Sequence, residues 1–373
     1  MHQPSHPPHS DGAGQPLARA GEEFRDDLRP PGSRNAEARR ILTAEELVPL
    51  TTLSDARSLL AVGQTLLLAA LGMALALASW PTAGWWLGGL AGLVFIGVAQ
   101  HGLFILAHEA AHYRLLSHRT LNDLLGRLIG MSGGVSMCTY RVTHRLHHNN
   151  LYGPEDPDTA IHGGYPRGKA YLWKKLAQDL LGWNAWKTYA YFFGSPAINE
   201  DTQRRISPLD DTSPQLRAAA RRDRWGVVAF HLLAPLCAAL AGGAQGLLIY
   251  LTLWTLPLLT TLQPILRLRA ICEHGAVNDL SSPLTAARTN RTWGSIGNWL
   301  GRFFLFPHHV NYHLEHHLYP AVPHYHLPRL HRLLLARNAL QAAEVRDLSE
   351  TWARVFAMRR PRATPPPFNE ETP

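Results

Sequence analysis

Two pairs of long apolar segments interrupt a chain that is otherwise polar and charged. The first pair is Ser58–Trp80 and Gly84–Ala107, and the second is Trp225–Leu240 and Gly246–Leu266. A helix needs about 20 residues to cross the hydrocarbon of a bilayer, and all but the third segment reach that length. Neither pair contains lysine or arginine, and a short turn joins the two segments of each pair. The pattern predicts an all-α integral membrane protein with four transmembrane helices in two hairpins.

The basic residues surround these hairpins and predict their orientation. Lysines and arginines cluster in 19–57, in 114–224 and from residue 267 onward. The positive-inside rule then places both termini and the long middle segment in the cytoplasm, as in a bacterial inner membrane or its equivalent. The apolar stretch Leu121–Val135 contains two charged residues, so we expect it at the membrane interface or packed on the core. These flanks account for the net charge of +8, so no nucleic-acid partner is expected.

Both ends of the chain differ in composition from the middle. Residues 1–35 are rich in proline, glycine and charge, which predicts a disordered tail. Thr43 and Glu46 form a capping-box pattern, which predicts a short helix directly after Thr43. We therefore expect a disordered tail at 1–35, a membrane domain at 36–340, and a C-terminal helix with a second disordered tail at 341–373.

Histidine is unusually frequent, with 21 among the 373 residues, and eight of these fall into three clusters. The first cluster has the pattern HxxxH, and the second and third have the pattern HxxHH. On a helix, residues three or four apart share a face, so each cluster can direct two or three imidazoles to one point. A metal requires such convergence, and imidazole suits iron, zinc and copper. The eight residues are His108, His112, His144, His147, His148, His313, His316 and His317.

All three clusters lie outside the apolar segments, at the face predicted to be cytoplasmic. His274 follows the fourth apolar segment at that same face and is a candidate ninth ligand. Eight imidazoles exceed the needs of one tetrahedral site, so we predict two metals per chain. Isolated histidines such as His101, His162, His324 and His331 are interpreted as surface residues or capped core residues.

Three other classes of protein share part of this pattern. His108–His112 is also HExxH, so an intramembrane zinc metalloprotease with Glu109 as general base is one alternative. That reading leaves six of the clustered histidines unexplained. A metal transporter or store is a second alternative, but transporters place their ligands near the middle of the membrane. A soluble protein with buried apolar helices is a third.

The order and spacing of the three clusters resemble the membrane fatty acid desaturase and hydroxylase superfamily. The segment PEDPD at 154–158 is similar to the acidic segment that often follows the second histidine box of that family. The segment NYHLEHHLYP at 311–320 looks like its third box. The resemblance covers about residues 45–335 and leaves both tails outside.

The resemblance implies a di-iron centre in a cytosolic helical cap, with the eight box histidines as ligands and His274 as the additional one. No catalytic residue beyond the metal ligands is expected. Acidic neighbours could orient the N–H groups of the ligands, and the candidates are Glu109, Asp156, Asp158, Glu273 and Glu315. No HPGG segment typical of cytochrome b5 is found, so we expect a separate electron donor of the ferredoxin or cytochrome b5 type.

Breaking an unactivated C–H bond requires O2 activated at a redox metal, because no side chain performs that chemistry. The resemblance therefore implies an O2-dependent membrane oxidoreductase that desaturates an acyl or lipid-like substrate. Hydroxylation of a lipid, a carotenoid or a small amino-acid-like metabolite is the alternative within the superfamily. The histidine boxes do not distinguish these reactions, because both begin with the same hydrogen abstraction.

Overall fold

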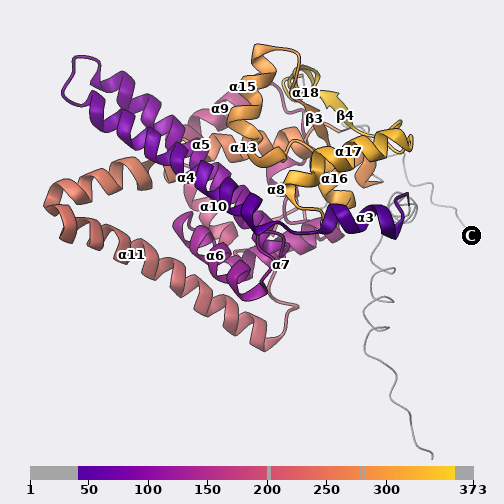
Figure 1. Cartoon of the computed structure of the whole chain (residues 1–373), viewed down its shortest axis with the longest axis horizontal. Helices are drawn as coiled ribbons and strands as arrows, with labels where there is room; N and C mark the ends of the chain where they lie inside the picture. The colour runs from indigo at the N-terminus through magenta and orange to yellow at the C-terminus, as the bar shows by residue number, and fades with distance from the viewer. Residues whose placement is uncertain (1–40, 200–202, 278, 281, 358–373) are drawn as a thin grey trace, which may run out of the picture.

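The computed structural model describes residues 41–199, 203–277, 279–280 and 282–357, and these are mostly helical (Figure 1). The predicted disordered tails fall on residues outside this range. The predicted capping box is confirmed, because the Thr43 hydroxyl accepts from the Glu46 backbone and the Glu46 carboxylate accepts from the Thr43 backbone. The helices of eight or more residues are α3 (Ala44–Thr51), α4 (Asp55–Ser79), α5 (Trp85–Ala111), α6 (Arg119–Ser132), α7 (Met137–Asn149), α9 (Lys169–Leu180), α10 (Ala185–Phe192), α11 (Pro214–Tyr250), α13 (Leu262–His274), α15 (Ile296–Leu305), α17 (Leu327–Ala336) and α18 (Leu348–Val355).

Shorter elements connect these helices. The four- to six-residue helices are α8 (Thr159–His162), α12 (Leu256–Leu259), α14 (Pro283–Ala286) and α16 (His313–Leu318). Tighter or wider helical turns occur at Leu251–Thr255, Pro307–His309 and His324–His326. The strands form two small sheets, β1 (Ala197–Ile198) antiparallel to β2 (Arg205–Ile206), and β3 (Thr289–Arg291) parallel to β4 (Val345–Asp347).

The first hairpin is held together by a close approach of its two helices. A Cβ added to Gly92 of α5 would lie 2.6 Å from the carbonyl oxygen of Gly72 on α4 and 2.8 Å from Cβ of Ala76. Small residues at such positions let two helix backbones pack tightly in a membrane, where van der Waals contact drives association. The glycines therefore fix α4 against α5, and α5 carries the first histidine cluster at its end.

The second hairpin differs from the prediction in its boundaries. Its first helix, α11, already begins at Pro214, and its backbone is non-helical at Gly242 and Gly243, where φ of Gly243 is +60°. Figure 1 shows the chain reversing direction there, near the turn that the sequence predicts. The predicted fourth segment is not one continuous helix, because Thr260 breaks it before α13 begins at Leu262.

Proline explains the separate start of α13. Pro264 lies in its first turn. Backbone N–H groups in the first turn of a helix have no acceptor within the helix, so a proline there costs no hydrogen bond. The new helix then carries His274 to the site at its last residue. Three stretches of the described residues are long and apolar enough to cross a membrane, namely Asp55–Ser79, Trp85–Ala111 and the interrupted Pro214–His274.

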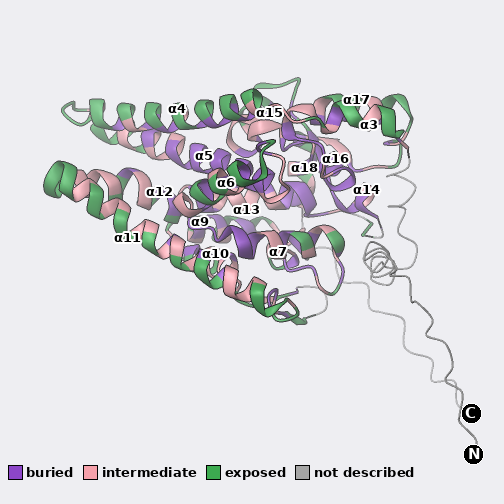
Figure 2. Ribbon diagram, turned by 60° about the horizontal axis from the view of Figure 1, so that its bottom comes forward, coloured by how far each residue is buried: buried purple, intermediate pink, exposed green. Residues whose placement is uncertain are grey.

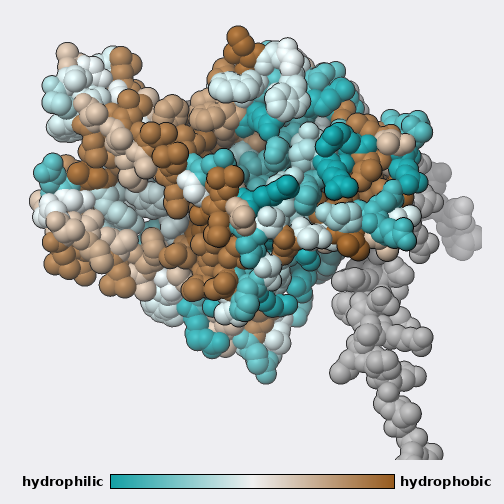
Figure 3. All heavy atoms as spheres, viewed as in Figure 1, coloured by the Kyte–Doolittle hydropathy of each residue, from teal (hydrophilic) through white to brown (hydrophobic). Residues whose placement is uncertain are grey.

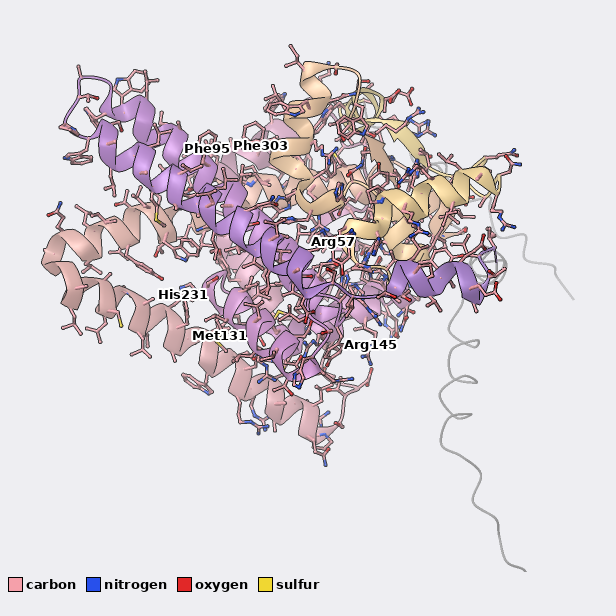
Figure 4. The ribbon with its side chains drawn as sticks, in the orientation of Figure 1. Arg57, Phe95, Met131, Arg145, His231 and Phe303 are labelled. Atoms are coloured by element: carbon pink, nitrogen blue, oxygen red, sulfur yellow. The ribbon has the colours of Figure 1, made fainter. Side chains whose placement is uncertain are left out.

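The hairpins and the remaining helices occupy opposite ends of the molecule. Hydrophobic residues gather on the hairpins and hydrophilic residues on the opposite end (Figure 3). Exposed residues follow α4 and α11, whereas buried residues gather where α5, α13 and α16 meet (Figure 2). The helix α15 packs on α5 through Phe95 and Phe303, whose rings are 6.1 Å apart (Figure 4). The described part of the C-terminal segment, residues 341–357, packs on the rest, with Leu348 in the same buried cluster as Phe306.

Candidate metal centre

Four helices bring the predicted ligands together. His108 lies in the last turn of α5 and His112 caps its end. The three histidines of the second cluster lie on α7, and those of the third lie on the short helix α16. His274 is the last residue of α13. All nine candidate ligands therefore approach from helix ends or short helices and meet in one region.

The nine imidazoles divide into two groups, and within each group the potential ligand nitrogens lie within 4.8 Å of one another. We name them the five-histidine cluster and the four-histidine cluster. The five-histidine cluster contains His108, His112, His144, His148 and His316. The four-histidine cluster contains His147, His274, His313 and His317.

Helical periodicity explains which histidines share a cluster. Each pair four residues apart remains in one cluster: His108 with His112, His144 with His148, and His313 with His317. The middle histidine of each HxxHH motif belongs to the other cluster, which places His147 with the third box and His316 with the first two. The motifs therefore interlock, and the stacked rings of His148 and His317, 4.2 Å apart, join the two clusters.

The spacing of the nitrogens fits metal coordination. The distance between Nε2 atoms is 2.8 Å for His112 and His144 and 3.2 Å for His148 and His316. In the four-histidine cluster, Nε2 of His274 lies 2.8 Å from that of His313 and 3.2 Å from that of His147. Two nitrogens at right angles on a metal, each about 2.1 Å away, are about 3.0 Å apart.

The protonation of most of these rings also suits a metal. Burial and then the neighbouring histidines lower the pKa of His144, His148 and His317 well below the usual histidine value. The neutral imidazole is the form that binds metal. His108 is buried, and neither of its ring nitrogens has a hydrogen-bond partner among the residues that the structure describes, which leaves a nitrogen available for a ligand bond.

His147 is the exception, and its environment is the most specific of the nine. Its Nδ1 lies 3.0 Å from Oδ1 of buried Asp156 and 3.7 Å from Oδ2 of Asp158. Burial lowers the pKa of His147, but these two carboxylates outweigh it and raise the pKa to about 9. The contact at Nδ1 directs Nε2 toward His274, the arrangement by which proteins orient metal-binding histidines.

The other acidic candidates lie nearby but contact the ligands less directly. Glu273 Oε1 is 3.6 Å from Nδ1 of His313, and Glu109 Oε1 is 3.9 Å from Nδ1 of His108. Glu109 also accepts a hydrogen bond of 2.9 Å from the backbone N–H of His324. Glu315 is buried but contacts none of the nine, because its carboxylate bonds Nδ1 of His331 at 2.5 Å and the hydroxyl of Thr289.

A cavity of about 600 Å³ opens onto the site and is lined by His144, His147, His274 and His313. Its volume lies within the range of small-molecule sites. The walls include Phe104, Tyr140 and Phe192 as well as several charged side chains. The two clusters and the cavity can therefore place a substrate beside metal-binding nitrogens.

Sequence reasoning missed two contributors to this region. His162, interpreted as an isolated surface or capped residue, is buried, and its Nε2 lies 4.0 Å from Asp156. With His147 and Asp156 it forms a further group of potential ligand atoms. The Tyr191 hydroxyl, which also lines the cavity, donates to Asp158 at 2.5 Å. Neither residue belongs to a motif, so the sequence offered no signal for them.

The comparisons with known proteins agree with this architecture. The sequence profile of the fatty acid desaturase family matches residues 83–348, and we conclude that the chain belongs to this family. The resemblance inferred from the histidine motifs is thereby confirmed. The match covers α5, the second hairpin and every box histidine, but not α4. The family membership accounts for the apolar helices of an integral membrane protein.

Similar curated proteins carry desaturase names. Dihydrorhizobitoxine desaturase of Bradyrhizobium elkanii is 32% identical over 64% of this chain and 65% of its own length. Probable fatty acid desaturase DES1 of Sorghum bicolor is 26% identical over 62% and 59%, respectively. A chloroplastic acyl-lipid omega-3 desaturase (ferredoxin) of Helianthus annuus is 25% identical over 62% and 52%. The chain thus spans between half and two thirds of the length of these relatives.

Proposed function

We propose that the protein is an O2-dependent oxidoreductase that desaturates an acyl or lipid-like substrate at two irons. The observation that carries the proposal is the pair of adjacent histidine clusters opening on one cavity. In this assignment the five-histidine cluster holds one iron and the four-histidine cluster holds the other. The irons would supply the O2 and electron chemistry that removes hydrogen from an unactivated C–H bond.

The protein side chains have supporting roles in this proposal. The histidines hold the metals as neutral ligands, and Asp156 fixes the orientation of His147. Glu273 and Glu109 lie near Nδ1 of His313 and His108, where they complement the charge of a bound metal. Phe104, Tyr140 and Phe192 form an apolar wall that positions the substrate and excludes water from the site.

Hydroxylation is the second candidate reaction, and a small polar metabolite is the second candidate substrate. The relatives differ on substrate, because one name refers to dihydrorhizobitoxine and another to an acyl lipid. The charged side chains of the cavity favour a substrate with a polar group, as developed below. A zinc hydrolase is not favoured, because one HExxH site would leave the four-histidine cluster without a role.

We further propose four membrane crossings, with the metal centre and both termini on the cytoplasmic side and the boundaries of the membrane domain at 36–340. The reversal at Gly242 and Gly243 divides the long third apolar stretch into two arms, which supports a second hairpin. The turn at 81–83 and the turn at Gly243 would then face the opposite side. This orientation rests on the distribution of basic residues.

A separate electron donor of the ferredoxin or cytochrome b5 type would reduce the site from this face. His112 and His148 are the partly exposed members of the five-histidine cluster, so the metal site approaches the surface there. Burial, followed by the charges of Arg114 and Arg145, lowers the pKa of His112 to about 3. Arg145 is exposed on α7 (Figure 4), so a positive surface beside His112 would attract an acidic carrier.

The mass of the product tests the proposed reaction. Cells that express the chain should accumulate a compound two hydrogens lighter than its precursor, and only in the presence of O2. A product heavier by one oxygen would favour the hydroxylase, and product formation without O2 would overturn both oxygen-dependent reactions. The variant His316→Ala should abolish the product while the protein remains in the membrane, because it removes the ligand that the third box contributes to the five-histidine cluster.

A further inference from the structure

The cavity beside the metal centre is more polar than an acyl chain requires. Its charged lining side chains are Asp158, Asp179, Lys187, Arg267, Arg269 and Glu273. Pockets for apolar ligands usually contain few polar groups, each placed to orient the ligand.

Most of these charges are satisfied by neighbouring side chains. Arg267 forms a bidentate ion pair with Asp179, in which Nε bonds Oδ2 and Nη2 lies 3.0 Å from Oδ1. Asp158 accepts from the Tyr191 hydroxyl at 2.5 Å. Three of the six charged groups are thus already bonded within the protein, and Lys187 is exposed, with its ammonium 5.6 Å from the ring of Trp186.

Arg269 is only partly satisfied. Its Nε donates to Oε1 of Glu273 at 2.8 Å, and this is the one side-chain hydrogen bond of its guanidinium among the described residues. The residue is 9% exposed, and its side chain lines the cavity. Guanidinium donors that lack a protein acceptor beside a cavity are available to a ligand.

The position of Arg269 places such a ligand at the metal centre. Glu273, which pairs with Arg269, is 3.6 Å from Nδ1 of His313 in the four-histidine cluster. The guanidinium therefore lies beside the four-histidine cluster, on the cavity side.

We propose that the two Nη groups of Arg269 bind the carboxylate of a small acidic substrate and so position its carbon chain beside the metal centre. A guanidinium presents parallel N–H donors that match the two oxygens of a carboxylate. The substrate class is thus a free carboxylic acid, because an acyl chain esterified to a glycerolipid has no free carboxylate to offer. This inference rests on the proposed function, since it names the substrate class for the same site.

Binding measurements test the anchor without requiring turnover. The full-length protein in detergent is titrated calorimetrically with hexanoate and with hexanamide, which have the same length and differ in charge. Hydrogen bonds to charged groups contribute enough that hexanoate should bind about 10-fold to 100-fold more tightly. Equal affinity of the wild-type protein for the two probes, or no binding of hexanoate at millimolar concentration, would overturn the proposal.

Variants of the two cavity arginines test which residue causes the preference for hexanoate over hexanamide. Arg269→Gln should reduce the preference for hexanoate to within about 3-fold of unity, and Arg269→Lys should keep part of it because a point charge remains. Arg267→Gln is the matched control, since it removes an arginine from the same helix and cavity wall that is already paired. The preference of Arg267→Gln for hexanoate should equal that of wild type. If both glutamine variants lose this preference equally, Arg269 is not a specific anchor for the carboxylate. Because binding alone is measured, failure of the proposed oxidation would not affect this result.

Discussion

Replacing Asp156 with asparagine tests how the four-histidine cluster is held. The Asp156 carboxylate lies 3.0 Å from Nδ1 of His147 and also accepts the backbone N–H groups of Tyr152 at 2.8 Å and Asp158 at 2.9 Å. All three neighbours direct hydrogen toward the carboxylate. Asparagine has one acceptor oxygen and one NH2 group, so at least one of these contacts becomes a donor facing a donor.

The size of the effect follows from this geometry. Loss of a partner that orients a metal ligand typically lowers metal affinity about 10-fold to 100-fold. That range corresponds to about 1.4–2.8 kcal/mol of binding free energy. Asp156 contacts His147 and none of the five-histidine cluster, so one iron should weaken while the other keeps its affinity.

Stepwise removal of iron by a chelator measures the two affinities separately. The wild-type protein should retain both irons up to a higher chelator concentration, whereas Asp156→Asn should lose one iron per chain about 10-fold to 100-fold earlier. Asp158→Asn is the matched control, because its carboxylate is 3.7 Å from His147 and already bonded by Tyr191. If Asp156→Asn releases both irons at the same chelator concentrations as wild type, Asp156 does not stabilise the metal of the four-histidine cluster through His147.

Three further predictions concern other parts of the molecule. Glu109→Gln should keep an activity within about 10-fold of wild type and still require O2, because the Glu109 carboxylate accepts from the His324 backbone and does not bond a metal ligand. If wild-type turnover does not need O2 and vanishes in this variant, a hydrolase is favoured. Arg145→Glu should slow reduction by an acidic donor at low salt without changing the iron content, and an unchanged reduction rate measured by stopped flow would exclude this docking face. Single cysteines at Ala83 and Ala244 should react with an impermeant reagent only from the side opposite the metal centre, and labelling of either from the cytoplasmic side would break the four-crossing topology.

The sequence predicted the nine histidines that the structure brings together, but not their grouping into two clusters. The box spacing marked the eight box histidines, and the position after the fourth apolar segment marked His274. Helical periodicity explains why His144 and His148 stay together. No local pattern could place His147 and His316 in opposite clusters, because that depends on how α7 and α16 pack. The same reason hid Arg269, an isolated arginine whose unused donors are visible only once the cavity is formed.

The sequence predicted the two helical hairpins but not all of their helix boundaries. The absence of lysine and arginine marked both hairpins, and glycines marked the second reversal, where Gly243 adopts a positive φ. The early start of α11 at Pro214 was missed because its first turns carry several arginines, which mask helical periodicity in a hydropathy pattern. The break at Thr260 was missed because it lies within a continuous apolar run.

Iron content, measured together with the Mössbauer spectrum of protein loaded with ⁵⁷Fe, tests the central claim most directly. We expect two irons per chain and a spectrum of two interacting sites. This spectrum should be lost when a ligand of the four-histidine cluster is removed in His147→Ala and when a ligand of the five-histidine cluster is removed in His316→Ala. One zinc per chain, with activity that survives complete removal of iron, would contradict this claim.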